Sequence, residues 1–196
     1  SRELPKRNYP EHVAVDSRGH LWVGFQRSEP ALRYDGVSWT TFDKSNSPLS
    51  PREGQAGELQ KLFADRSGNV WFASYKRGII RYDGAAWAQY TPADSLRSVA
   101  GIAPDPAGAL WFAAQSGAWA WNGERWKRYT AAEGLASDKV RCVAVDQSGA
   151  KWFGTASGAS RFDGTTWKTF TSADGLPSSR VNALAADSKG NLWFGT

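Results

Sequence analysis

The chain has 196 residues, of which 41% are hydrophobic and 22% are charged, and these proportions are typical of a folded globular protein rather than a disordered one. Its single cysteine, Cys142, excludes an internal disulfide framework and a cysteine-based metal cluster. The net charge of +5 comes from Lys and Arg scattered among acidic residues, so we expect no nucleic-acid partner. No apolar run approaches the roughly 20 residues that cross a bilayer, and we expect no membrane span within the chain. Because the composition holds no Met and the chain begins with Ser, we expect a processed or excised piece of a longer reading frame.

A motif of Asp, Gly and Trp recurs along the whole chain with a period of about forty residues. The Trp positions are Trp22, Trp71, Trp111, Trp152 and Trp193, and successive numbers differ by 49, 40, 41 and 41. This period is the length of a β-propeller blade. It predicts repeats at about 11–58, 59–97, 98–138, 139–180 and 181–196.

Each full repeat predicts four strands, as the fourth repeat illustrates. The run VRCVAVD at 140–146 is apolar on both alternating faces, which indicates a strand buried on both sides. Asp and Gly then predict a tight turn into the strand KWFGT at 151–155. The Asp-Gly of SRFDG at 160–164 is a strong hairpin signal, and it leads into WKTF at 167–170, where aromatic and polar residues alternate.

Such blades have two apolar faces and must stack on one another around an axis, with the repeated Trp residues as packing anchors. We therefore expect residues 1–196 to form a single all-β domain, a β-propeller of four-stranded antiparallel blades with four full repeats plus a half repeat. We favour a five-bladed ring. A larger parent propeller, or two copies that complete one another, would also close the structure, and the sequence leaves these alternatives open.

The first repeat is longer than the others because it contains the insertion DKSNSPLSPREGQAGE at 43–58. This segment is rich in Pro, Ser and Gly and predicts a loop, which is a lid, a partner contact or a mobile decoration. The five Asp residues of the repeated turns occupy identical positions, so we interpret them as structural caps rather than general acids. They are Asp16, Asp65, Asp105, Asp146 and Asp187.

The loops between second and third strands vary from repeat to repeat, and variation on a rigid scaffold is typical of a binding face. Loop residues that could contact a polar or anionic ligand are Gln26, Arg27, Tyr75, Lys76, Arg77 and Gln115. Each of them could equally be an ordinary solvated loop residue. Trp119 stands where the neighbouring repeats have Ile80 and Ser160, and it is either a stacking surface for a sugar or a filler of extra space between blades.

A second group of candidates lies where the first strands begin, nearest the predicted axis. Polar groups that converge there could bind a ligand or hold ordered water. The candidates are Glu11, Gln60, Arg141 and Asn182, with His12, Lys61 and Cys142 beside them. Cys142 is interpreted as a small buried residue rather than a nucleophile.

The stretches VNALAADSKGNLWFGT, GASRFDGTTWKTFT and SADGLPSSRV closely resemble the two-component-regulator propeller repeat, a family of bacterial blades. The resemblance implies a periplasmic or extracellular sensor that recognises a glycan or another small polar ligand in bacterial signalling. A protein-interaction or assembly module is the alternative, in which the partner is another copy or the missing part of a larger propeller. We expect no enzyme, no metal and no cofactor, because His12 and His20 are the two histidines present and Glu11 with His12 is the one pair suited to acid–base work. A propeller lyase or hydrolase is the least favoured reading.

Overall fold

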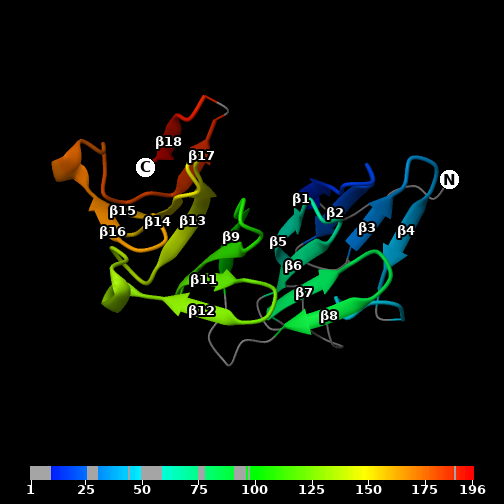
Figure 1. Ribbon diagram of the computed structural model, residues 1–196. Coiled ribbons are helices and arrows are strands. Elements are labelled where there is room, and N and C mark those ends of the chain that lie inside the picture. Colours follow the sequence, from blue (N-terminus) through cyan, green and yellow to red (C-terminus); the bar gives the residue numbers. More distant parts are fainter. Residues whose placement is uncertain are drawn as a thin grey trace. The chain divides into compact units, whose positions relative to one another are not determined.

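The computed structural model describes residues 10–25, 31–43, 45–49, 59–74, 78–90, 96, 98–187 and 189–196. Over these residues the chain is all-β apart from two short 3-10 helices, and its strands form five antiparallel sheets (Figure 1). No helix within the described residues is long and apolar enough to cross a membrane. The chain divides into two compact units, Ser1–Pro92 and Ala93–Thr196. The expectations of a single domain and of a five-bladed ring stay predictions.

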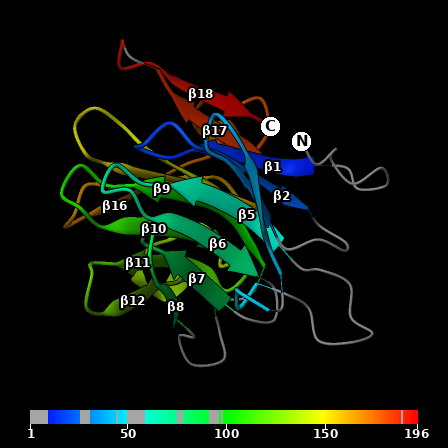
Figure 2. The same cartoon turned by 90° about the vertical axis from the view of Figure 1, so that its right-hand side faces the viewer.

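The first unit contains two complete blades. The strands of blade 1 are β1 (Pro10–Val15), β2 (Leu21–Phe25), β3 (Ala31–Tyr34) and β4 (Trp39–Phe42), paired in chain order. The strands of blade 2 are β5 (Leu59–Ala64), β6 (Val70–Ser74), β7 (Gly78–Tyr82) and β8 (Trp87–Tyr90), which lie side by side in Figure 2. The predicted four-stranded antiparallel blade is confirmed in both. Most of the insertion at 43–58 lies outside the described residues.

The second unit contains two complete blades and a two-stranded sheet. Blade 3 is formed by β9 (Val99–Pro104), β10 (Leu110–Ala114), β11 (Gly117–Trp121) and β12 (Trp126–Tyr129). Blade 4 is formed by β13 (Val140–Val145), β14 (Lys151–Thr155), β15 (Ala159–Phe162) and β16 (Trp167–Phe170). The 3-10 helices η1 (Ala131–Glu133) and η2 (Ser172–Asp174) follow β12 and β16. The half-blade consists of β17 (Ala183–Ala186) and β18 (Leu192–Gly195).

The repeated Asp organises the turn between the first two strands of every repeat. In blade 4 the Asp146 carboxylate accepts hydrogen bonds from the backbone of Ala150 at 3.0 Å and from the indole of Trp152 at 2.8 Å. The glycine three residues after each Asp has a φ between 81° and 93° in all five turns, a conformation that residues with a side chain resist. The Asp-to-Trp bond is present in all five repeats, at 2.7–3.2 Å. The motif therefore recurs because it fixes both the turn and the Trp side chain.

The anchored Trp of one blade packs against an aromatic ring of the next blade. Trp22 lies 5.8 Å from Phe72, Trp111 lies 5.7 Å from Phe153, and the rings meet edge to face. Trp152 meets Phe194 of the half-blade in the same way at 5.8 Å. Edge-to-face pairs contribute about 0.5–1.5 kcal/mol beyond their area burial. These pairs form the core between neighbouring blades within each unit.

A buried ion pair also joins blades 3 and 4. Lys151 Nζ lies 2.6 Å from Asp105 Oδ2, and both side chains are buried. In the second and fifth repeats this bond is made within the turn, by the amide of Asn69 or Asn191 at 2.8 Å. The third repeat has Ala109 at that position, so the lysine of the next blade takes over the role of the amide.

Candidate functional site

A β-bulge interrupts the first strand of every complete blade at the same place. In blade 4, Val140 pairs with Thr155 and Cys142 with Gly154, so Arg141 is the extra residue. In the half-blade, Asn182 stands at the same repeat position, and its N–H donates to the Gly195 carbonyl at 2.7 Å. A bulge shifts the strand register at its extra residue and redirects the side chain, and bulges are frequent beside active sites. We call these positions the bulge row: Glu11, Gln60, Ala100, Arg141 and Asn182.

The four polar candidates predicted at the starts of the first strands are therefore members of the bulge row. Their shared position could not be inferred from the alternation of apolar and polar residues alone, because a bulge changes the register between two strands. The third blade has Ala100 there and offers no polar group at this position.

Arg141 and Asn182 come together in the second unit. Arg141 Nη1 lies 3.5 Å from Asn182 Oδ1, a long contact between adjacent members of the row. The Nε of Arg141 is buried and makes no hydrogen bond within the part of the chain that the structure describes. On the other side of β13 lies β9, where a Cβ on Gly101 would approach the Val143 nitrogen to 3.3 Å. The guanidinium thus lies beside the Asn182 amide, and its buried Nε makes no hydrogen bond to the described residues.

In the first unit, Glu11 and Gln60 stand beside His12 and Lys61. Burial lowers the pKa of His12, the nearby Lys61 lowers it further, and Glu11 opposes the shift. His12 is half-buried on β1, whereas Glu11 is exposed. The lowered pKa favours the neutral imidazole at physiological pH.

The loop candidates receive little structural support. Gln26, Arg27, Tyr75, Lys76 and Arg77 lie outside the described residues. Gln115 is exposed in the turn between β10 and β11. Gln115 stays a predicted ligand contact, because its loop varies between repeats.

Trp119 is buried within blade 3, with 7% of its surface exposed. Its indole nitrogen lies 3.4 Å from Ser116 Oγ, and the guanidinium of Arg128 lies over its ring at 5.8 Å. A covered ring offers little area to a sugar. The geometry therefore favours the space-filling interpretation of Trp119 over the stacking surface.

The remaining reactive groups have structural roles in the described residues. Burial raises the pKa of the Cys142 thiol to about 11, so the thiolate is scarce at neutral pH. His20 Nδ1 lies 3.1 Å from Asp16 Oδ2 within the first turn. Hydrogen bonds hold the pKa of Asp187 below its usual value, chiefly through Asn191. For Asp16 and Asp146, burial favours the protonated form, but hydrogen bonds from the turn and the Trp indole outweigh it and lower the pKa.

The described residues contain no group of three His, Cys, Asp or Glu side chains that could hold a metal ion. A guanidinium beside an amide can bind a carboxylate or another polar group. The chemistry that this arrangement offers is recognition.

Comparison with known proteins supports the fold. One family model, described as two component regulator propeller, matches residues 175–196, and no curated protein sequence matches the chain. The extracellular domain of a hybrid two-component system of B. thetaiotaomicron is 19% identical with a TM-score of 0.75, and the match covers 94% of this chain and 26% of that one. A catalytically inactive virginiamycin B lyase from Staphylococcus aureus with quinupristin is 16% identical with a TM-score of 0.75, over 95% and 63%. YCF48 bound to D1 peptide is 17% identical with a TM-score of 0.65, over 98% and 63%.

The chain thus spans about a quarter of the length of the sensor structures that it matches. The resemblance inferred from the repeated motif is confirmed by the family model, whose match includes the half-blade. We conclude that the chain has a β-propeller fold and carries a repeat of the two-component regulator propeller family at residues 175–196.

Proposed function

We propose that this chain is a non-catalytic, ligand-binding propeller of a bacterial signalling system, located in the periplasm or outside the cell. The family of its repeat supports this proposal, as do the similar structures described as extracellular domains of two-component systems. Its ligand is a glycan or another small polar molecule, bound at Arg141 and Asn182.

The observation that carries the proposal is the pairing of Arg141 with Asn182. These side chains come from blade 4 and the half-blade, and Arg141 is the extra residue of a bulge. A guanidinium recognises a carboxylate through two parallel N–H donors, and an amide can bind a hydroxyl group as donor or acceptor. An acidic sugar presents both groups, so we propose a uronate as the probe.

Isothermal titration calorimetry with glucuronate and galacturonate, against neutral glucose and galactose, tests this assignment. We expect heat of binding with the uronates, lost in Arg141→Gln and retained in Arg161→Gln. Arg161 is a matched control because its guanidinium lies over the Trp152 ring at 6.0 Å, in β15 and away from the bulge row. Equal binding of neutral and acidic sugars, or uronate binding that survives Arg141→Gln, would contradict the assignment.

An enzyme is the second candidate, because virginiamycin B lyases are among the similar structures. Such an activity would need an acid–base pair. Glu11 with His12 is the candidate pair, since His20 is bonded to Asp16 within a structural turn. We expect quinupristin to be recovered unchanged by chromatography after incubation with the chain. Conversion that Glu11→Gln abolishes would replace the binding proposal with a catalytic one.

A further inference from the structure

Three cations gather in the second unit, where the neighbouring strands β13 and β17 begin. At the start of β13, Lys139 and Arg141 stand on either side of Val140. In the next repeat, Arg180 stands directly before Val181. Both valines are buried, whereas Lys139 and Arg180 are exposed and Arg141 is half-buried. We call Lys139, Arg141 and Arg180 the cation cluster.

Equivalent turns lead into the two strand starts. The backbone N–H of Lys139, like that of Arg180, donates to the hydroxyl oxygen of the serine two residues before it, at 3.2 Å and 3.1 Å respectively. Each cation then stands two residues before a member of the bulge row, and these two members, Arg141 and Asn182, meet at 3.5 Å. Two residues span about 7 Å along a strand. Lys139 and Arg180 therefore continue the site of Arg141 and Asn182 along both strands.

The acidic residues of the loops before these strands are bonded to the turns themselves. Glu133, Asp138 and Asp174 accept backbone N–H groups of these turns at 2.6–2.9 Å. Within the described residues, no member of the cation cluster makes an ion pair with a carboxylate, in contrast to Lys151, which lies 2.6 Å from Asp105. The positive charge of the cluster is therefore left for a ligand.

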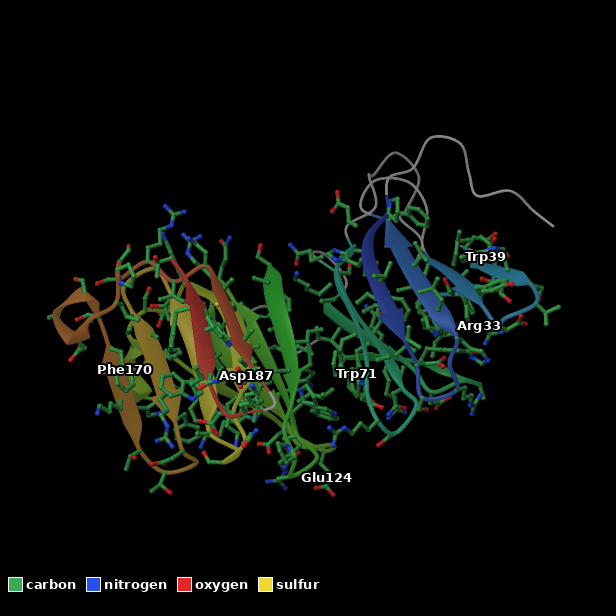
Figure 3. All side chains as sticks on the ribbon, turned by 90° about the horizontal axis from the view of Figure 1, so that it is seen from above. Arg33, Trp39, Trp71, Glu124, Phe170 and Asp187 are labelled. Atoms are coloured by element: carbon green, nitrogen blue, oxygen red, sulfur yellow. The ribbon has the colours of Figure 1, made fainter. Side chains whose placement is uncertain are left out.

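The repeated Asp turns lie at the opposite ends of the same strands. Asp146 follows β13, and Asp187 follows β17 in the turn that leads into β18 (Figure 3). Asp146 stands five residues after Arg141, which corresponds to about 16 Å of strand. This distance is about twice the Debye length of about 8 Å at physiological ionic strength, so the turn carboxylates do not neutralise the cation cluster.

A ligand that matches this cluster carries more than one anionic group. One carboxylate is satisfied by one guanidinium through two parallel N–H donors, so Arg141 alone can hold it. Lys139 and Arg180 begin about 7 Å further along their strands, and like charges that stand together repel one another unless anions lie between them. The Asn182 amide adds a group that can bind a hydroxyl as donor or acceptor. Repeated carboxylates with hydroxyl groups between them are the chemistry of an acidic sugar chain.

We propose that the cation cluster, together with Asn182, binds an acidic oligosaccharide, a chain of uronate units, rather than a single acidic sugar. The inference rests on the proposed function and names the ligand class of the same site. Arg141 and Asn182 hold the carboxylate and a hydroxyl group of one unit. Lys139 and Arg180 bind the carboxylates of the units that flank it.

Calorimetric titration of the full chain with galacturonate and with trigalacturonate tests the proposal. We expect trigalacturonate to bind at least about tenfold more tightly, and this advantage should shrink at high salt. The double variant Lys139→Gln with Arg180→Gln should reduce the advantage to about threefold or less. The matched control is Lys127→Gln with Lys168→Gln, which removes the same charge from the exposed faces of β12 and β16 and should keep the full advantage.

The possible failures of this inference and of the proposed function are distinguishable. If galacturonate binds through Arg141 and trigalacturonate binds no more tightly, the inference is wrong and the proposed function stands. An advantage of trigalacturonate that survives the double variant also overturns the inference. Inorganic polyphosphate that binds as tightly as trigalacturonate overturns the assignment to a sugar chain, because charge alone would then be sufficient. If neither uronate binds, both the inference and the uronate assignment of the proposed function are wrong.

Discussion

Replacing Lys151 by leucine should destabilise the chain, although leucine is the residue at the equivalent position of three other repeats. The substitution removes the 2.6 Å bond to Asp105 and leaves a buried carboxylate with two remaining donors, the Trp111 indole and the Ala107 N–H. A hydrogen bond to a charged group contributes about 1.5–3 kcal/mol, and breaking a buried pair costs about 3–5 kcal/mol. Because Asp105 keeps two donors, we expect a loss of about 2–4 kcal/mol in the free energy of unfolding. Urea unfolding followed by Trp fluorescence measures this loss.

The double variant Lys151→Leu with Ala109→Asn is the decisive control. Asparagine four residues after the Asp would donate to Asp105 as Asn69 and Asn191 donate in their turns. We expect it to restore about half or more of the lost stability. A single variant within about 0.5 kcal/mol of the unmodified chain would refute the reasoning, and so would a double variant no more stable than the single one.

The pH dependence of the same pair has a definite sign. Burial alone would raise the pKa of Asp105, but the bonds from Lys151, Ala107 and Trp111 outweigh it and lower the pKa below its usual value. A lowered folded-state pKa gives stability that is present above pH about 4 and is lost as the pH falls through the folded value. Lys151→Leu should therefore reduce the loss of stability on acidification below pH about 4.

Three further outcomes test the described geometry. The Cys142 thiol, with its pKa raised to about 11 by burial, should react with a thiol reagent at pH 8 only after denaturant is added. Gly154→Ala should cost about 1–3 kcal/mol, because the new methyl group would collide with the Cys142 sulfur and would approach Val181 Cγ1 to 2.7 Å; a variant as stable as the unmodified chain in urea would contradict this packing. Asp163→Asn should flatten the pH profile of thermal stability between about pH 4 and 2, because the Thr166 hydroxyl, more than any other group, lowers the pKa of Asp163 to about 2; an unchanged profile would contradict the role of this bond.

The blade pattern was predictable because its local chemistry is repeated in sequence. Asp146, Gly149 and Trp152 specify one turn and one anchored ring through bonds within seven residues, so the motif can be interpreted without tertiary information. The four polar residues at the starts of the first strands could be selected by comparing repeats. Their shared position at a bulge could not be predicted, because the register of two strands depends on backbone pairing rather than on side-chain pattern.

Contacts between blades were harder to predict. The signal for the Lys151–Asp105 pair was present, since Ala109 lacks the amide of Asn69 and a lysine stands where Leu192 stands in the next repeat. Predicting this pair would have required connecting the alanine at position 109 with the lysine at position 151, which lie 42 residues apart. The exposure of Trp193 was beyond prediction from its motif, because its own turn bonds are the same as in the repeats whose Trp is buried.

The bulge row has a consequence for how such a protein can change its specificity. Side chains of a strand alternate between the buried and the exposed face, and the extra residue of a bulge stands outside this alternation. Its replacement therefore leaves the buried side chains of the strand unchanged. Glutamate, glutamine, alanine, arginine and asparagine already occupy the position in repeats with the same turn motif. Recognition and blade packing can therefore diverge independently. A library confined to Arg141 and Asn182 would sample new ligands on an unchanged scaffold.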